Sequence, residues 1–260
     1  MDLRDIRAAT RTWAEIILRQ ETGRPAQAES FIYPVLGDLG KEMAAKRLDM
    51  AALLPQEYLD LKDLAPLDPI LLAEPPNGTQ VEYLLLVRKN SGALTLADLR
   101  GLKVAIEAAG PNTLPWLWVE SLLKRAGLPR SSVFFGGIQE AYKGSQAILS
   151  LFFKHADAAV AARHSFATTA AMNPQVAQQL ITIAASPGFA HGVMVLRPDV
   201  DAELRGASYR GLTNLHTHAT GRQVLTLFRA GRMIPFKPEQ LKSVEDLLRE
   251  SRSPGARGNG

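Results

Sequence analysis

Apolar and polar residues follow two different periods along this chain. From residue 5 to 20 the apolar positions recur at helical spacing, at Ile6, Ala9, Trp13, Ile16 and Ile17. Similar patterns predict helices over 36–48, 114–126, 144–156, 165–180, 220–231 and 237–251, with a short one at 98–102. Apolar runs rich in Val, Ile, Leu and Tyr predict strands over 27–33, 49–54, 78–90, 103–108, 131–138, 157–162, 181–186 and 190–198.

This alternation of strands and helices predicts an α/β fold built from βαβ units, with mostly parallel sheets. The predicted strands outnumber those of one compact five-stranded sheet, so we expect two α/β lobes. The first lobe is expected to comprise 1–88 and 190–250, and the second lobe 89–189. The strand at 78–90 is long enough to cross between the lobes, and 190–198 could return. The Gly-, Pro- and Arg-rich end, 251–260, is expected to be a disordered tail.

The composition excludes several kinds of site and partner but does not by itself indicate a function. The 260 residues include no cysteine, which excludes disulfides, thiolate nucleophiles and cysteine-based metal sites. The net charge of +4 is too mild and too evenly spread to indicate a nucleic-acid partner. No apolar stretch approaches the length of a membrane span. The first residues, MDLRDIRAATRTWAEIIL, show no secretory signal, so either the protein is cytoplasmic or an export segment lies upstream of Met1.

Enzyme motifs give no support for catalysis. The chain has no GxSxG, HExxH, GxxxxGK[ST] or GxGxxG. His216 and His218 would share one face of a strand and could offer two metal ligands, but a polar surface pair is the favoured interpretation. We therefore expect neither an enzyme nor a metal or cofactor.

The junction AGPNTLP, at residues 109–115, has a physical rationale for binding an anion. Free N–H groups and the dipole at a helix start favour negative charge. Asn112 and Thr113 could cap this helix or donate to an oxyanion, together with the N–H groups of Thr113, Leu114 and Trp116. Pro115 falls in the first turn, where its missing N–H costs little. Cap and ligand site both remain open.

A second junction of the same kind follows the next predicted strand. Gly136 and Gly137 precede it, and Lys143, Gly144 and Ser145 open the helix, with Lys143 adding a cation. In doubly wound sheets, ligands bind outside the carboxyl ends of the strands, where both junctions should lie. Three tyrosines near predicted strands could pack in the core or line a cleft; they are Tyr33, Tyr58 and Tyr83.

Two segments resemble the phosphate/phosphite/phosphonate-binding proteins of ABC transporters, which are type II periplasmic binding proteins. They are LTLADLRGLKVAIEAAGPNTLPWLWVESLLKRAGL and FFGGIQEAYKGSQAILSLFFKHADAAVAARHSFATTAAMNPQ. The polar helix start, the Asp-Ala turn before a strand and the NPQ stretch occur in the family's order. SPGFAHGVMVLRPDV and TGRQVLTLF extend the resemblance, which covers 5–248.

The resemblance implies two lobes that close on a small oxyanion and deliver it to a membrane permease. It places the oxyanion at the helix start that matches Asn112, Thr113 and Leu114. A further polar or basic contact would fall near Lys143 to Ser145, and cleft tyrosines of the first lobe would match Tyr33 and Tyr83. A monomeric protein outside the cytoplasm, in the periplasm or anchored to a membrane, is implied.

The chain departs from the family at three places. Where binders of aminophosphonates carry carboxylates for the ligand's amine, this chain has Arg163 and Ser186. Arg163 indicates either a wholly anionic ligand or a structural ion pair. The chain also starts at the family's first helix and lacks the strand before it, through a late start codon or truncation. An open sheet edge would follow, so we expect weaker binding and lower stability than in a full-length relative.

The leading interpretation is a solute-binding protein that captures a phosphate-, phosphite- or phosphonate-like oxyanion for an ABC importer. Two alternatives stay open. One is a sensory domain of the same fold, which reports ligand occupancy to a signalling partner. The other is an enzyme on a binding-protein fold, for which only His216 and His218 are candidates.

Overall fold

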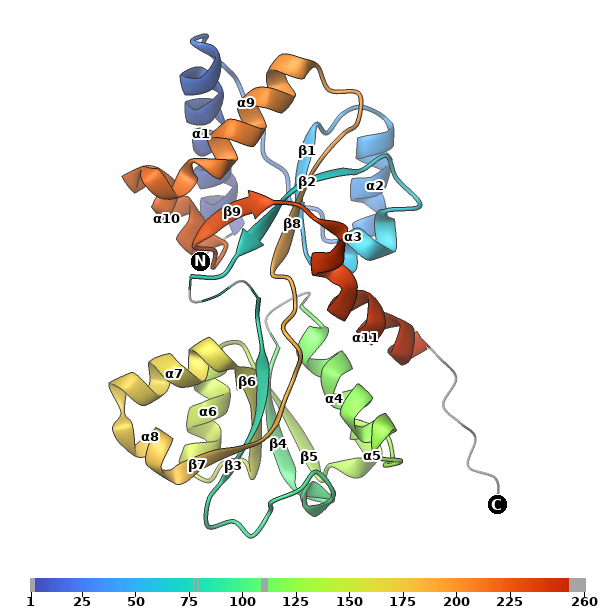
Figure 1. Cartoon of the computed structure of the whole chain (residues 1–260), viewed down its shortest axis with the longest axis vertical. Helices are drawn as coiled ribbons and strands as arrows, with labels where there is room; N and C mark the ends of the chain where they lie inside the picture. Colours follow the sequence, from blue (N-terminus) through green and yellow to red (C-terminus); the bar gives the residue numbers. More distant parts are fainter. Residues whose placement is uncertain (1–2, 77, 79, 109–111, 253–260) are drawn as a thin grey trace. The chain divides into compact units, whose positions relative to one another are not determined.

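A computed structural model describes residues 3–76, 78, 80–108 and 112–252 of the chain. Two compact units account for these residues (Figure 1). Unit 1 comprises 1–80 and 190–241, and unit 2 comprises 81–189 and 242–260. Each unit has its own sheet with helices against it, so the expected α/β class with two sheets is confirmed.

Unit 1 is built on a four-stranded sheet in the order β1-β8-β2-β9. Its strands are β1 (Met50–Leu53), β2 (Asp68–Glu74), β8 (Gly192–Leu196) and β9 (Arg232–Pro235). Its helices are α1 (Leu3–Thr22), α2 (Leu36–Ala44), α3 (Pro55–Leu61), α9 (Ala202–Thr213) and α10 (Ala219–Leu227), with 3₁₀ turns η2 (Leu215–Thr217) and η3 (Pro238–Leu241). One apolar cluster packs α2 and α3 against the sheet, and another packs α1, α9 and α10. The sheet is therefore covered by helices from distant parts of the sequence.

Unit 2 is built on a five-stranded sheet in the order β5-β4-β6-β3-β7. The strands are β3 (Tyr83–Arg88), β4 (Lys103–Glu107), β5 (Gly137–Ala141), β6 (Ala158–Ala162) and β7 (Leu180–Ala185). The helices are α4 (Leu114–Arg125), α5 (Ser131–Phe134), α6 (Gly144–Phe152), α7 (Arg163–Met172), α8 (Pro174–Gln179) and α11 (Lys242–Arg252), with the 3₁₀ turn η1 (Ala97–Leu99). Figure 1 shows α6, α7 and α8 on one face of the sheet and α4 and α5 on the other.

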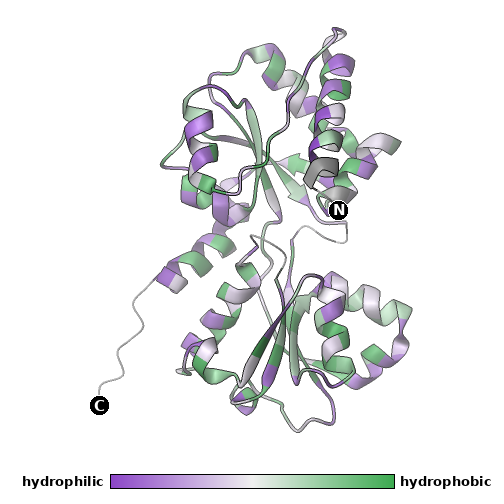
Figure 2. Ribbon diagram, turned by 180° about the vertical axis from the view of Figure 1, so that it is seen from behind, coloured by the Kyte–Doolittle hydropathy of each residue, from purple (hydrophilic) through white to green (hydrophobic). Residues whose placement is uncertain are grey.

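The central strands of unit 2 are buried from both faces. All five residues of β6, Ala158 to Ala162, are buried, because helices cover both sides of the sheet. In Figure 2 the strands are mostly green and the outward helix faces carry most of the purple. The resulting rigid sheet fixes where its strand ends and the following helix starts lie.

The expectation of mostly parallel sheets is wrong. Every neighbouring pair in unit 1 is antiparallel, and in unit 2 only β4 with β5 and β4 with β6 are parallel. Two strands that each follow a passage of the chain from one unit to the other account for most of this difference. β8 inserts between β1 and β2, and β3 inserts between β6 and β7, each running against its neighbours.

Two predicted strands also need correction. Residues 27–33 form no strand; they run beside α1, where Arg7 Nε donates to the Ser30 carbonyl at 2.9 Å and the guanidinium lies over the Phe31 ring. Residues 131–134 form helix α5 instead of a strand, since Glu120 on α4 accepts hydrogen bonds from the N–H and hydroxyl of Ser131. Both corrections come from tertiary contacts that local pattern does not show.

The expected lobe boundaries also shift. β3 begins at Tyr83 and pairs with β6 and β7, so the first boundary falls at 80/81 and not at 88/89. Helix α11 packs on α4, so 242–252 belong to unit 2 and not to the first lobe. Residues 251 and 252 of the expected tail are helical, and 253–260 lie outside the described residues.

Candidate functional site at the carboxyl edge of the sheet in unit 2

One edge of the sheet in unit 2 gathers most of the polar side chains that the sequence singles out. β4, β5, β6 and β7 all end at this edge, and the antiparallel β3 begins there. We call it the carboxyl edge. Asn112 and Thr113 follow β4, Lys143 and Ser145 follow β5, Arg163 follows β6, Ser186 follows β7, and Tyr83 opens β3. The fold brings these residues to one side of one unit, which is the position that ligands take in α/β sheets.

The start of α4 is held by Asn112. Its Oδ1 accepts a hydrogen bond from the Leu114 N–H at 3.2 Å, and its Nδ2 donates to the Tyr83 hydroxyl oxygen at 2.9 Å. Thr113 is the N-cap residue, yet its exposed side chain makes no capping hydrogen bond. Leu114 is buried and contributes through its backbone. Capping is thus the task of Asn112, while the Thr113 side chain is exposed; residues 109–111 lie outside the described residues.

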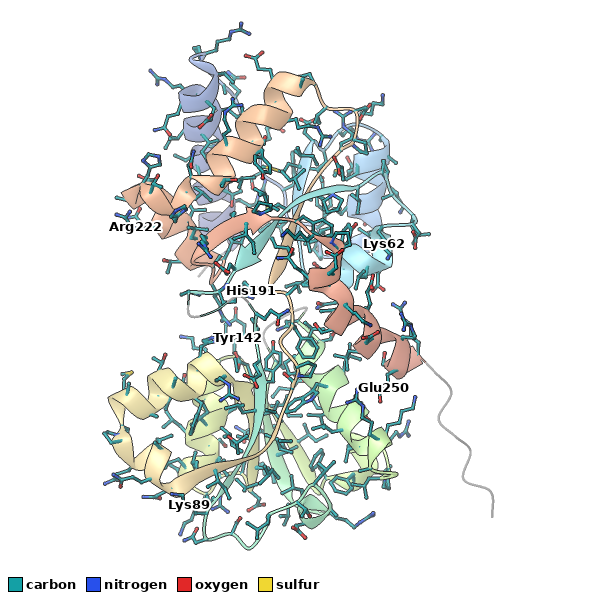
Figure 3. All side chains as sticks on the ribbon, in the orientation of Figure 1. Lys62, Lys89, Tyr142, His191, Arg222 and Glu250 are labelled. Carbon is teal, nitrogen blue, oxygen red and sulfur yellow. The ribbon has the colours of Figure 1, made fainter. Side chains whose placement is uncertain are left out.

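The start of α6 is the second junction. Lys143 is its exposed N-cap residue, and its N–H donates to Gln146 Oε1 at 3.1 Å. Ser145 is half-buried in the first turn. Tyr142 directly precedes Lys143 and is 65% exposed; Figure 3 labels it at this end of unit 2, with Lys89 at the other end. Sequence reasoning missed Tyr142, although an aromatic residue between a strand end and a helix start is the available signal.

Arg163, at the start of α7, forms an ion pair with Glu82. Its Nε and Nη2 both donate to the Glu82 carboxylate, the latter at 2.9 Å, and its backbone N–H donates to the Glu82 carbonyl at 2.7 Å. The hydrogen bond between the side chains raises the pKa of Arg163 and lowers that of Glu82. Of the two interpretations of Arg163, the ion pair is observed, and a ligand contact stays a prediction.

Ser186 and Tyr83 join β7 to β3. The buried Ser186 Oγ accepts from the Tyr83 N–H at 2.8 Å and donates to the Pro187 carbonyl at 2.7 Å. The Tyr83 ring is buried, 6.2 Å from that of Phe189. Tyr83 therefore belongs to unit 2, not to the first lobe as expected, because β3 pairs with β6 and β7.

The other candidate tyrosines lie in unit 1. Tyr33 is half-buried, with its ring 6.3 Å from that of Phe31, and burial followed by the charge of Glu42 raises its pKa. Tyr58 is buried and meets Phe236 edge-on at 6.0 Å, as a packing residue does. A ligand contact by Tyr33 stays a prediction.

The prediction that His216 and His218 share one face of a strand is wrong. His216 lies in the turn η2, with Nδ1 3.1 Å from the Thr213 carbonyl, and His218 is the N-cap residue of α10. Among the described residues, no group of three or more His, Asp or Glu side chains could hold a metal ion. A helix long and apolar enough to cross a membrane is likewise missing from the described part of the chain.

Sequence reasoning also missed Glu107, the last residue of β4. The residue is 6% exposed and its Oε2 accepts the Ala162 N–H at 2.8 Å. An acidic residue at the end of an otherwise apolar strand, Val104-Ala105-Ile106-Glu107, was the signal that could have found it. A buried carboxylate thus lies at the edge where an anion is expected.

Comparison with known families and structures gives one consistent result. The family model described as the periplasmic phosphonate substrate-binding protein of ABC transporters matches residues 4–241. No curated protein sequence matches the chain significantly.

Solved structures of similar fold cover nearly the whole chain. XAC2383 from Xanthomonas citri bound to ATP is 14% identical with a TM-score of 0.69, and the match covers 95% of this chain and 92% of that one. A binding protein component of an ABC phosphonate transporter from Pseudomonas aeruginosa is 17% identical with a TM-score of 0.65, and the match covers 97% of this chain and 83% of that one. PhnD1 from Prochlorococcus marinus in complex with methylphosphonate is 16% identical with a TM-score of 0.62, and the match covers 96% of this chain and 94% of that one. These likenesses show the fold, that of type II periplasmic binding proteins.

Proposed function

The chain belongs to the phosphonate-binding family of periplasmic ABC-transporter substrate-binding proteins, and from this membership we propose that it captures a phosphate-, phosphite- or phosphonate-like oxyanion and delivers it to a membrane permease. The family match spans 4–241, which is nearly all of both units. The proposed role is binding without chemical conversion of the ligand. The proposed place of action is outside the cytoplasm, where the proteins of this family work.

The start of α4 carries the proposal. The helix has 12 residues, and its first turn contains no acidic side chain, so its positive end is uncompensated by its own sequence. The exposed Thr113 hydroxyl lies at this end, with Asn112 fixed between the helix and Tyr83. A hydroxyl and backbone N–H groups around an oxyanion form charge-assisted hydrogen bonds, which are strong and directional.

The other residues of the carboxyl edge support an anionic ligand. Lys143 is exposed at the start of α6, the other helix start at this edge, and adds positive charge. Glu82 is already neutralised by Arg163, so this carboxylate does not offer an unpaired charge to a ligand amine. We therefore favour an oxyanion without an amino group. Ser145 and Tyr33 remain candidate contacts of the ligand. Ser186 is a weaker candidate, because its hydroxyl is already engaged in hydrogen bonds within the fold.

A thermal-shift screen tests the proposal. The ligands are phosphate, phosphite, methylphosphonate, 2-aminoethylphosphonate and sulfate. A ligand at about 100 times its dissociation constant adds about 2.7 kcal/mol to the free energy of unfolding, which gives a clear rise in Tm. Absence of a shift with every oxyanion would refute the proposal.

A substitution at Thr113 then locates the site. Thr113→Ala removes the exposed hydroxyl, while the capping bond from Asn112 to the Leu114 N–H remains. We expect calorimetry to show at least tenfold weaker binding, and Thr113→Ser to retain most of the affinity as the matched control. Equal affinity in Thr113→Ala would place the ligand elsewhere.

A further inference from the structure

Glu107 lies where two helices of unit 2 begin. It shares a face of the sheet with Ala105, because alternate residues of a strand point the same way, and α6 packs against that face. Its Oε2 accepts the N–H of Ala162, the N-cap residue of α7, at 2.8 Å. A Cβ at Gly144, the first residue of α6, would lie 2.5 Å from the same oxygen and from the Ser165 hydroxyl. We call Glu107, Gly144, Ala162 and Ser165 the Glu107 cluster.

Both helix starts in this cluster favour an anion. α6 has nine residues and α7 has ten, and neither has an acidic residue in its first turn. Their first N–H groups have no acceptor within the helix. Asp or Glu near a helix start stabilises it through these N–H groups and the dipole. The Glu107 carboxylate reaches these two helix starts from β4, which directly precedes neither α6 nor α7. Because residue 144 is glycine, no side chain there competes with the carboxylate for space.

We propose that Glu107 is a built-in anion that fills the anion-binding position between the starts of α6 and α7 and makes the neighbouring site at α4 select against doubly charged oxyanions. The first half concerns the fold of unit 2 alone. The second half rests on the proposed function, with the ligand at the start of α4.

Three links connect Glu107 to the start of α4. Ala162, whose N–H Glu107 accepts, is the register partner of Tyr83, and the Tyr83 hydroxyl accepts from Asn112. Register partners on neighbouring strands lie about 5 Å apart between Cα atoms, and the Tyr83 side chain spans a similar length, so an anion at α4 lies on the order of 10 Å or slightly more from the Glu107 carboxylate. At an effective dielectric constant near 20, one additional negative charge at about that distance weakens binding by about tenfold.

Chemical rescue tests the built-in anion without any oxyanion ligand. In Glu107→Ala the carboxylate is removed, and added acetate can take its place. We expect acetate to raise the Tm of this variant by several degrees and to saturate, whereas acetamide, which has the same shape without charge, does not. The wild type and Glu140→Ala, which loses an exposed carboxylate on β5, should show neither response. Equal effects of acetate on Glu107→Ala and Glu140→Ala would overturn the proposal.

Failure of Glu107→Ala to fold without an anion is also decisive. Recovery of folded protein on adding acetate is then the expected result. If acetate restores nothing while Glu107→Gln folds normally, shape and not charge is what the position requires, and the proposal is overturned. If Glu107→Gln also needs acetate to fold, the charge requirement stands.

Charge selection is tested with methylphosphonate and methanesulfonate. Calorimetry is run on either side of the second ionisation of methylphosphonate, with the sulfonate as a ligand that stays singly charged. Glu107→Gln should improve affinity for the dianion by about tenfold relative to the monoanion, and Glu140→Gln should leave that ratio unchanged. An unchanged ratio in Glu107→Gln overturns the selection. Lack of binding by the wild type would refute the proposed function instead, while acetate rescue still decides the role of Glu107.

Discussion

In the proposed site, Asn112 would prepare the start of α4 without being the main contact of the ligand. Its two amide atoms are both engaged, Oδ1 with the Leu114 N–H and Nδ2 with the Tyr83 hydroxyl. The amide thereby fixes the first turn of α4 and ties it to β3. The exposed Thr113 directly follows this fixed residue, so Asn112 would act on the proposed ligand mainly by fixing the backbone at the helix start.

Replacing Asn112 by aspartate should separate folding from binding. Asn112→Asp keeps the oxygen that accepts the Leu114 N–H, and an acidic residue is favourable at a helix start, so the Tm without ligand should stay close to that of the wild type. The added negative charge should weaken oxyanion binding at least tenfold in calorimetry. Asn112→Ala is the opposite case, with about 1 kcal/mol of stability lost with the cap. Undiminished binding in Asn112→Asp would mean that the oxyanion does not lie at α4.

At the scale of elements, the predictions succeeded where the signals were local. The pattern of 103–108 and 114–126 predicts β4 and α4 closely, since α4 is followed by Gly127 at φ +66°, a conformation that favours glycine at a helix end. The pattern failed to predict elements whose structure depends on contacts with residues distant in the sequence. β2 was not predicted, because Pro69 reads as a break, yet a register shift between Pro69 and Leu71 accommodates it. Glu107 has a local signal, an acidic residue that ends an apolar strand, but its partners are helix starts that come 37 and 56 residues later in the chain.

Helix α11 makes a pH-dependent contribution to unit 2. Figure 3 labels Glu250 on this helix; its carboxylate accepts from Arg125 at 2.6 and 2.8 Å and from Ser121 at 2.8 Å. The hydrogen bond from Arg125 is the main cause that lowers the pKa of Glu250 below that of an ordinary glutamate. A lowered folded-state pKa stabilises the fold at any pH above the unfolded-state value, and this stability is lost as the pH falls through the folded-state pKa.

Glu250→Gln should therefore destabilise the protein in a pH-dependent way. Arg125 is largely exposed, so the effect at pH 7 should be below about 1 kcal/mol in urea unfolding. The difference from wild type should shrink as the pH falls from the unfolded-state pKa of Glu250 through its lower folded-state pKa, where the carboxylate becomes protonated in the folded protein as well. Glu140→Gln, on the exposed side of β5, serves as the control. A difference that stays constant with pH would show that Glu250 contributes by packing alone.

At the scale of the whole molecule, each unit has its own sheet and its own apolar clusters, and the candidate residues divide unequally between them. The carboxyl edge of unit 2 holds the candidates from Tyr83 to Ser186, and unit 1 holds Tyr33. The sequence pattern predicted two lobes from the number of strands. It could not assign Tyr83 to its unit, because that assignment depends on which strands β3 pairs with.

Hydrogen exchange along the whole chain should show which parts respond to an oxyanion. With saturating phosphonate or phosphate, we expect slower amide exchange in the first turn of α4, at Thr113 and Trp116, because the ligand there would accept hydrogen bonds from N–H groups that have no acceptor within the helix. Exchange at the start of α6, at 144–146, should change much less, since Glu107 already fills that position. In Thr113→Ala the protection at α4 should be lost at the same ligand concentration. Protection around Tyr33 would support its predicted contact. Strong protection at α6 without any at α4 would reverse the assignment of the two helix starts, because the oxyanion would then displace Glu107 and not bind beside it.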